Sequence, residues 1–397
     1  MFIPQELNPP IRILMGPGPS DVHPRVLKAM NTRLLGHLDP AFLKIMDDVK
    51  MSLREVFQTQ NDWTLPVSGT GTAGMETCIV NLIEEGDEVA VCTAGYFGDR
   101  IADMATRFGA KVHRIEAPWG KTIEEEKLES VLKNSKIKIV TVVNAETSTG
   151  VYQSLDEISR LAHEHGALLL VDAVTSLGGL PVEVDKLKID ACYSGTQKCL
   201  GAPPGLAPTT LSNDALDVIS KRRQKVYGWY LDLTLLNKYW GKERVYHHTA
   251  PITMVYALYE ALRVLLEEGL ENSFTRHKIH HHALVAGLEA IGLDMLVEPQ
   301  FRLPMLNTPK VPEGIDDAKV RRRLLNEFNI EIGAGFSVLA GKIWRIGLMG
   351  YSANKRNVLY FLSALENILH SEGYKLDIGA SLKGANQIYD QTYVKNH

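Results

Sequence analysis

The sequence predicts an α/β protein, with a large domain whose mostly parallel sheet is sandwiched by helices and a smaller C-terminal α+β domain. Three observations lead to this prediction. Helical and strand patterns alternate from residue 21 to about residue 205, as in layered α/β sheets. Residues 167–171 are continuously apolar, which is typical of a strand buried on both faces of a parallel sheet. After about residue 250 the alternation gives way to long helices and short strands.

The N-terminal part begins with an extended arm. Residues 1–20 contain Pro9-Pro10 and Gly16-Pro17-Gly18-Pro19, which favour irregular backbone. The elements that follow are predicted from apolar spacing and β-branched content. Helices are expected at 26–30, 42–57 and 155–165, and strands at 89–92, 137–143 and 167–171.

The C-terminal part changes character. Helices are expected at 252–267, 272–291, 316–328 and 355–369, and strands at 303–307, 330–332 and 342–348. We therefore place the large domain at 21–267 and the small domain at 268–377. Residues 378–397 are polar and show no pattern, so we expect a poorly ordered tail.

Composition excludes several classes of protein. The 397 residues are 45% hydrophobic and 23% charged, as in ordinary globular proteins, and the net charge of −4 gives no basic excess for nucleic acid. No apolar run reaches the roughly 18 residues of a membrane span. The four cysteines form no disulfide framework and no CxxC pair. With neither a signal peptide nor a C-terminal Ser-Lys-Leu, we expect a cytoplasmic protein, with the peroxisome and mitochondrion left open.

The segment Gly69-Thr70-Gly71-Thr72 forms a glycine-rich turn that opens an apolar-periodic stretch. Such a turn presents free backbone N–H groups at the positive end of a helix dipole, and the threonines add hydroxyl donors. This arrangement suits a phosphate. The alternative is an ordinary turn with threonine as the N-cap.

Asp172 follows the buried strand 167–171 directly. In open α/β sheets ligands bind at the carboxyl ends of the strands, and a charged group there needs a partner. The alternative is an aspartate that caps the next loop.

Lys198 ends the run Ser194-Gly195-Thr196-Gln197-Lys198, after a strand-like stretch and before a loop with Pro203-Pro204. A lysine held between a strand end and a rigid loop can have a shifted pKa and react with carbonyls. The alternative is an exposed loop lysine.

Together these three segments are more specific than any one of them. A phosphate cradle, a carboxylate at a strand end and a held lysine are the parts that bind pyridoxal phosphate. Tyr96 and Phe97, just after the strand at 89–92, offer aromatic rings to stack on the cofactor.

On these residues the chain resembles the class V, fold-type I aminotransferases that depend on pyridoxal phosphate, within the alanine–glyoxylate and serine–pyruvate aminotransferase group. The resemblance spans nearly the whole chain and follows order and spacing. Its landmarks are Met15–Ser20, Gly69–Thr72, Glu146–Gly150, Val171–Val174, Ser194–Lys198, Tyr246–Thr249 and Trp344–Gly350.

The resemblance implies roles for the matched residues. Lys198 would be the Schiff-base lysine and Asp172 the partner of the ring nitrogen, while the substrate pocket would lie near Gly36. The remaining cofactor contacts would be Thr70, Gly71, Thr72 and Gln197 on the phosphate, Phe97 on the ring and Thr147 on the ring hydroxyl side. Relatives often have Trp in place of Phe97 and Ser in place of Thr147.

Two further implications concern the partner subunit and the substrate. Tyr246 and Thr249 would reach the phosphate of the neighbouring subunit, which makes the active unit a homodimer. Arg345 would bind the substrate α-carboxylate. Arg345 also stands in an otherwise apolar strand, where a guanidinium needs a partner. From the residues alone, an internal salt bridge to Asp or Glu remains open.

The predicted reaction is transfer of an amino group from L-alanine to glyoxylate, giving pyruvate and glycine, with serine as a secondary donor. The alternatives in the same group use serine, 3-hydroxykynurenine or ureidoglycine. A cysteine desulfurase would need a nucleophilic cysteine on a later mobile loop, but the last cysteine is Cys199. A binding protein without activity is disfavoured by the presence of Lys198, Asp172 and Arg345.

Four histidines cluster in one predicted helix, at His277, His280, His281 and His282. His277 and His281 have the i, i+4 spacing of a metal pair, but no further ligand stands at a useful spacing. We therefore expect a solvated helix face and no metal site.

Overall fold

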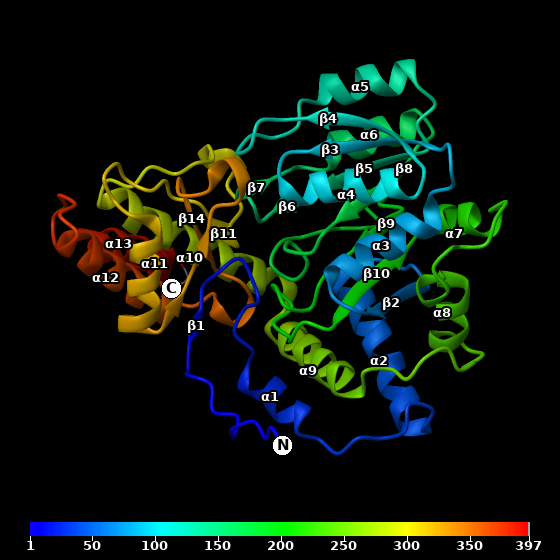
Figure 1. Cartoon of the computed structure of the whole chain (residues 1–397), viewed down its shortest axis with the longest axis horizontal. Coiled ribbons are helices and arrows are strands. Elements are labelled where there is room, and N and C mark those ends of the chain that lie inside the picture. Colours follow the sequence, from blue (N-terminus) through cyan, green and yellow to red (C-terminus); the bar gives the residue numbers. More distant parts are fainter. Residues whose placement is uncertain (396–397) are drawn as a thin grey trace.

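A computed structural model describes residues 1–395 and confirms the predicted α/β architecture (Figure 1). Its centre is a seven-stranded sheet in the order β2-β10-β9-β8-β5-β3-β4. β10 is antiparallel to both of its neighbours and the other pairs are parallel. The strands are β2 (Trp63–Ser68), β3 (Glu88–Thr93), β4 (Lys111–Glu116), β5 (Ile139–Val143), β8 (Leu168–Asp172), β9 (Ala191–Tyr193) and β10 (Leu206–Leu211).

The strand register places the polar strand ends side by side. Every residue of β5 is buried, as its β-branched sequence favours. Val143 at the end of β5 is opposite Asp172 at the end of β8, and Asp172 is opposite Tyr193 at the end of β9. The segments that follow these strands therefore leave the sheet at one edge, where ligands bind in open α/β folds.

Helices pack on the sheet, with α3 against β9 and β10 and α4 against β3. α2 lies on β2 and is itself covered by α9, which also contacts α1. The helices of this part are α1 (Pro24–Met30), α2 (Pro40–Phe57), α3 (Gly71–Leu82), α4 (Tyr96–Arg107), α5 (Glu125–Asn134), α6 (Asp156–Glu164), α7 (Asn213–Ser220), α8 (Leu233–Trp240) and α9 (Ile252–Glu268).

The C-terminal elements lie to one side of the large sheet, with the N-terminal β1 beside them (Figure 1). A three-stranded sheet has the order β11-β14-β13, and β1 pairs with β12. The helices are α10 (Leu270–Ala290), α11 (Asp317–Phe328), α12 (Lys355–Ser371) and α13 (Ala380–Lys395). The strands are β1 (Ile13–Leu14), β11 (Leu306–Asn307), β12 (Ile330–Glu331), β13 (Gly333–Ala334) and β14 (Trp344–Gly347), and a separate hairpin joins β6 (Ala145–Glu146) to β7 (Val151–Tyr152).

Two main hydrophobic cores support these two groups of elements. One runs from Phe42 to Leu265 and encloses the large sheet. The other joins the C-terminal helices and strands, and it includes Met15 from the N-terminal arm. The boundaries at residues 20 and 267 stay predictions. No helix in the described part of the chain is long and apolar enough to cross a membrane.

The prediction of a poorly ordered tail from residue 378 is wrong for the described part of it. Ala380–Lys395 forms α13, which packs along α10, and Ala385 and Tyr389 are buried. The contact depends on small residues, since a Cβ on Gly384 would lie 2.7 Å from the Ala286 carbonyl oxygen. Close packing through small residues leaves no apolar stripe in the sequence. Residues 396–397 of the predicted tail lie outside the described residues.

The prediction of a solvated histidine face is wrong for His277 and His281, whereas His282 is exposed. His277 is fully buried and His281 is 6% exposed, because α10 is covered by the turn at Gly350 at one end and by α12 and α13 at the other. His281 Nδ1 lies 2.6 Å from the side-chain oxygen of Asn307. Residues 1–395 contain no group of three or more His, Cys, Asp or Glu placed to hold a metal.

Candidate active site

A cavity of about 200 Å³ lies at the carboxyl edge of the large sheet. Eight of the residues predicted from the sequence line it, although they come from segments far apart in the chain. They are Thr70, Gly71, Thr72, Phe97, Thr147, Asp172, Gln197 and Lys198.

One end of the cavity is built to hold an anion. Thr70 caps α3 without a side-chain hydrogen bond, and the Gly71 and Thr72 amides stand in the first turn, where no intrahelical acceptor exists. Gly71 lies close to the opposite wall, since a Cβ there would be 3.1 Å from Val174. Arg100 donates to Thr72 Oγ1 at 2.9 Å and adds positive charge. These groups are the donors that a phosphate needs.

Asp172 is a buried carboxylate with two donors. Tyr193 Oη donates to it at 2.7 Å and the Val174 amide at 2.9 Å. Burial raises the pKa of Asp172 to about 6, although both hydrogen bonds oppose the shift. No Lys, Arg or His within residues 1–395 forms an ion pair with it. A cationic ring nitrogen would supply that missing partner.

Lys198 is 8% exposed, and its Nζ donates to the Pro17 carbonyl oxygen. Burial, together with the charge of Arg345, lowers the pKa of Lys198 to about 8. A Cβ on Gly18 would lie 2.6 Å from Nζ, so only glycine fits there, and its φ of +113° also favours glycine. The lysine is thus held and has a substantial neutral fraction near neutral pH.

Arg345 projects from β14 and is 4% exposed. Its Nε donates to the Ala334 carbonyl at 2.6 Å and Nη1 to the Thr147 carbonyl at 3.2 Å, while its Cζ lies 3.8 Å from the centre of the Phe336 ring. Burial lowers the pKa of Arg345 to about 10. Within the described residues no carboxylate forms a salt bridge with Arg345, so the internal salt bridge left open by the sequence is absent.

The residues present fit pyridoxal phosphate. The Oε1 of Gln197 is buried without a partner at the cavity wall, and the anion-binding turn, the unpaired Asp172 and the neutralisable Lys198 match the cofactor's phosphate, ring nitrogen and aldehyde. The model of the aminotransferase class-V family matches residues 14–358. The chain belongs to the class V aminotransferases.

The relatives of this class V aminotransferase include two kinds of glyoxylate transaminase. The chain is 42% identical to the (S)-ureidoglycine–glyoxylate transaminase of Bacillus subtilis, over 97% of each chain. It is 41% identical to the alanine–glyoxylate aminotransferase of Rattus norvegicus, over 91% of this chain and 89% of the relative.

Solved structures agree with these relatives. The alanine–glyoxylate aminotransferase from Nostoc sp. has a TM-score of 0.91 and 51% identity, over 93% of this chain and 98% of the other. The ureidoglycine–glyoxylate aminotransferase from Bacillus subtilis has a TM-score of 0.95 and 44% identity, over 97% and 100%. The protein is therefore a pyridoxal-phosphate-dependent transaminase of the alanine–glyoxylate and ureidoglycine–glyoxylate group.

Sequence reasoning about this aminotransferase gave no role to four residues of the site, namely Glu146, Arg100, Pro17 and Tyr193. Glu146 is buried, which raises its pKa, and it accepts hydrogen bonds from the Phe97 amide at 3.2 Å and from Ser148 Oγ at 2.6 Å. It thereby fixes the start of α4, which carries Phe97 and Arg100. Pro17 contacts Lys198, and Tyr193 holds Asp172. The proline and glycine run at 16–19 was a signal for close backbone approach, but nothing in it pointed to the lysine.

Four predicted site residues do not line the cavity of this class V aminotransferase within one chain, namely Arg345, Gly36, Tyr246 and Thr249. Gly36, Tyr246 and Thr249 are exposed, with Tyr246 at 57%. His37, next to Gly36, stacks obliquely on Tyr246 with 5.3 Å between ring centres. The two segments therefore lie together on the surface of the chain.

Cys199 does not suit the desulfurase alternative. Its thiol is buried and donates to the Thr175 carbonyl at 3.2 Å. Burial raises the pKa of Cys199 to about 12, so almost no thiolate forms at neutral pH. Structures of NifS-like proteins share the fold at 17–18% identity.

Proposed function

We propose that the protein transfers the amino group of L-alanine to glyoxylate, giving pyruvate and glycine. The observation that carries this proposal is Arg345. It is a buried cation beside Lys198 without a carboxylate partner in the described chain, and the α-carboxylate of an amino acid would supply one. Glyoxylate as the acceptor is supported by both groups of relatives, whose names share it.

In the proposed mechanism some residues bind the cofactor and substrate, and Lys198 also moves a proton. Pyridoxal phosphate, when bound, supplies an aldehyde that captures amines and a ring that withdraws electrons. Lys198 Nζ would hold the cofactor through its aldehyde and would move the proton from the substrate α-carbon. Asp172 keeps the ring nitrogen protonated. Arg345 orients the substrate through its carboxylate, and Phe97 packs on the ring.

The phosphate would be held by the turn at Thr70, Gly71 and Thr72 with the amide of Gln197, and Thr147 would lie on the ring hydroxyl side. Arg100 joins this set, because it already bonds to Thr72. The cations that line the cavity are thus Arg100 at the phosphate end and Lys198 in the centre. A second substrate carboxylate would be buried without a partner, at a cost of several kcal/mol. We therefore expect aspartate and glutamate to be rejected.

We also propose that the active unit is a homodimer. Tyr246 and Thr249 are exposed and do not line the cavity of their own chain. Several large apolar side chains near them are exposed as well, namely Tyr227, Trp229, Tyr230 and Val245. A second copy that covers this surface would bring Tyr246 and Thr249 to the partner's phosphate, and the adjoining Gly36 to the partner's substrate pocket.

Ureidoglycine–glyoxylate transamination is the second candidate. It is supported by the B. subtilis relative at 42% identity and by the structure with a TM-score of 0.95. A ureido group replaces the methyl group of alanine in that donor, so the pocket would need hydrogen-bonding partners at that position. A pocket of apolar character would instead accept alanine and, less well, serine.

A panel of amino donors with glyoxylate as acceptor tests the proposal through kcat/KM. Alanine should be the best donor, with serine reduced by about 100-fold at most, because an apolar pocket discriminates a hydroxyl only weakly. The same donors with pyruvate as acceptor serve as the control for acceptor choice. A preference for ureidoglycine or 3-hydroxykynurenine over alanine would overturn the donor assignment and leave the transaminase assignment standing. The expected cytoplasmic location stays a prediction.

A further inference from the structure

α9 and α10 meet at a sharp bend behind the active site. Gly269 alone separates them, with a φ of +85°. Glu268 at the end of α9 forms a two-pronged ion pair with Arg276 on α10, in which Nη2 lies 2.9 Å from Oε2. The bend is therefore held by its own salt bridge, between α9, which belongs to the core of the large sheet, and α10, which contributes to the C-terminal core.

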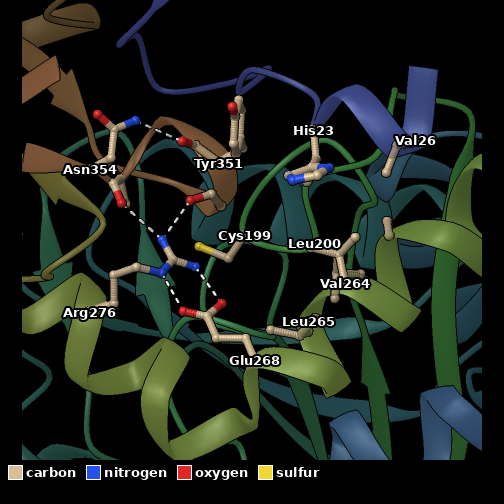
Figure 2. Close-up of a pocket in the computed structure, with 14 residues that line it drawn as sticks. His23, Val26, Cys199, Leu200, Val264, Leu265, Glu268, Arg276, Tyr351 and Asn354 are labelled. Carbon is tan, nitrogen blue, oxygen red and sulfur yellow. Dashed lines mark hydrogen bonds and ion pairs between the residues drawn. The ribbon is translucent and has the colours of Figure 1, made fainter. Parts of the chain in front are cut away.

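The other side of the Arg276 guanidinium holds a backbone turn. Nη1 donates to the carbonyls of Gly350 at 2.8 Å and Ala353 at 2.9 Å. Gly350 begins the turn at 350–352 and Ala353 follows it, and the turn itself comes after Arg345 and β14. Figure 2 shows Arg276 between Glu268 on one side and this turn on the other. It lines a second cavity, of about 350 Å³, together with Cys199 and His23.

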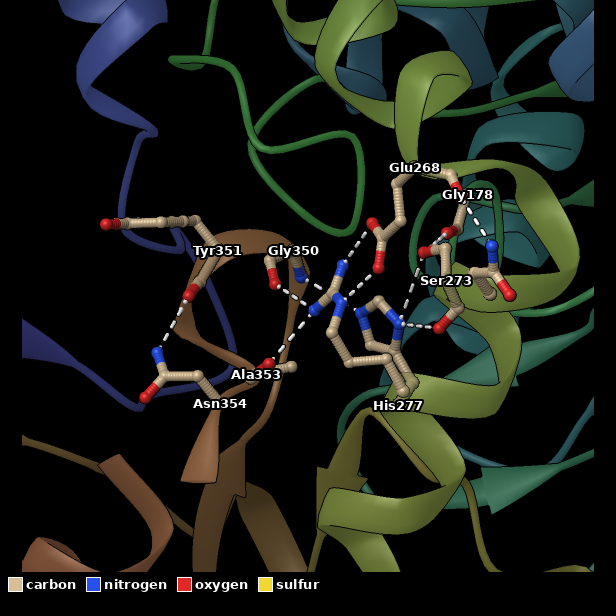
Figure 3. Close-up of polar contacts among 10 residues, drawn as sticks. Gly178, Glu268, Ser273, His277, Gly350, Tyr351, Ala353 and Asn354 are labelled. Atoms are coloured by element: carbon tan, nitrogen blue, oxygen red, sulfur yellow. Dashed lines mark hydrogen bonds and ion pairs between the residues drawn. The ribbon is translucent and has the colours of Figure 1, made fainter. Parts of the chain in front are cut away.

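His277 fixes the same turn from the next position of α10. Its Nδ1 donates to the Ser273 carbonyl at 2.7 Å, which leaves Nε2 to accept from the Gly350 amide at 3.1 Å. Ser273 Oγ in turn donates to the Gly178 carbonyl at 2.7 Å (Figure 3). Gly178 belongs to the loop that follows Asp172 and β8.

The clamped turn lies directly against the reactive lysine's backbone. A Cβ on Gly350 would lie 3.2 Å from the Lys198 carbonyl, 3.2 Å from the Cys199 carbonyl and 3.2 Å from the Gly201 Cα. A shift of the turn toward the lysine loop is therefore blocked by contact. A shift away from it would break the hydrogen bonds to Arg276 and His277.

We infer that Arg276 and His277 are positioning residues for transamination, which hold the turn at 350–352 against the Lys198 backbone and so set the distance between Lys198 and Arg345. The inference rests on the proposed roles of Lys198 and Arg345. Neither positioning residue lines the cofactor cavity. They act through the backbone, and a displacement of about 1 Å in a reacting group can cost about 100-fold in rate.

The first test compares Arg276→Met with Arg323→Met. Arg323 on α11 has a similar exposure, pairs with Glu327 of its own helix and with Glu372 at the end of α12, and lines neither cavity, so its loss controls for a broken ion pair. We expect a similar fall in Tm for both variants. Arg276→Met alone should lower kcat by roughly 10- to 100-fold. It should also slow the association of pyridoxal phosphate with the cofactor-free protein and shift the pH midpoint of the visible absorbance band of the loaded protein. Arg276→Lys should recover part of each loss.

A second pair of variants keeps the inference testable if Arg276→Met fails to fold. His277→Leu leaves the Gly350 amide without an acceptor, whereas His277→Gln supplies a side-chain oxygen. We expect His277→Leu to lower kcat and move the absorbance midpoint, and His277→Gln to restore both. Equal Tm losses with kcat, cofactor association and absorbance midpoint unchanged would overturn the positioning role.

Borohydride treatment of the loaded wild-type protein separates this inference from the proposed function. It should attach the cofactor permanently to Lys198, as seen by peptide mass. Absence of that label overturns the role of Lys198 itself. A label at Lys198, together with Arg276 and His277 variants whose kcat, cofactor association and absorbance midpoint equal those of the wild type, overturns only the positioning role.

Discussion

The titration of Lys198 should govern how fast the cofactor-free protein binds pyridoxal phosphate. The neutral amine reacts with an aldehyde, and burial lowers the pKa of Lys198 from 10.5 to about 8. At pH 7 about 9% of a lysine with a pKa of 8 is neutral, against about 0.03% of an ordinary lysine, a gain of roughly 300-fold. The binding rate should follow that neutral fraction.

The decisive interval lies between pH 8 and pH 9. With a pKa of about 8 the neutral fraction rises from about 50% to about 90%, so the rate should less than double. An ordinary lysine would gain about tenfold over the same interval. The assay is the stopped-flow absorbance change when pyridoxal phosphate is mixed with cofactor-free protein across pH 6 to 10.

The cofactor also titrates, so a lysine-containing peptide measured over the same pH range serves as the control. The ratio of the two pH profiles of the binding rate isolates the effect of the titration of Lys198. Replacement of Arg345 by Gln should move the inflection toward higher pH, because the Arg345 charge lowers the pKa of Lys198 after the larger effect of burial. A corrected rate that still rises about tenfold between pH 8 and pH 9 would refute this reasoning.

Four further outcomes are expected. Asp172→Asn should bind the cofactor but lower kcat by about tenfold or more, measured in single-turnover reactions with alanine, since a neutral amide holds the ring proton poorly. Arg345→Lys should raise KM for both substrates in steady-state assays, because a point charge replaces a bidentate fork. In the cofactor-free protein Lys198→Met should raise the free energy of unfolding at pH 7 by up to about 3 kcal/mol, seen as a higher Tm, because burial penalises the charged amine below about pH 8. This gain should fade between pH 8 and 10.5. Mixing inactive Lys198→Ala chains with inactive Tyr246→Ala/Thr249→Ala chains should restore activity on subunit exchange, whereas no recovery after demonstrated mixing would argue that each chain builds its site alone.

Much of the cavity was predictable because its residues stand at the ends of recognisable elements. Asp172 ends a continuously apolar strand, and Gly71 opens a helix after a glycine-rich turn. Parallel strands place their carboxyl ends at one edge, so these residues had to lie near one another once the sheet was inferred. Lys198 stands after a strand and before two prolines, and this unusual position identified it as the third candidate residue of the cavity.

Contacts that join distant segments carried no such signal. Pro17 accepts from Lys198 across 181 positions of the chain, and Arg100 meets Thr72 from another helix. No periodicity within one element shows which remote backbone will touch it. For the same reason Gly36 and Tyr246 could be matched to a family pattern, but their place on the surface came only from the structure.

The sequence by itself predicted the layered fold and the cofactor, and it singled out Lys198 and Asp172 as candidate residues, because apolar periodicity and strand-end polar groups are local properties of the chain. The tertiary structure decided that α13 packs on α10 and that His277 is buried. It also decided that Arg345 has no carboxylate partner in the described chain. These features arise from surfaces contributed by several elements at once: a helix enclosed by others needs no apolar stripe of its own, and a charge is paired or unpaired only with respect to side chains that folding brings within a few ångströms.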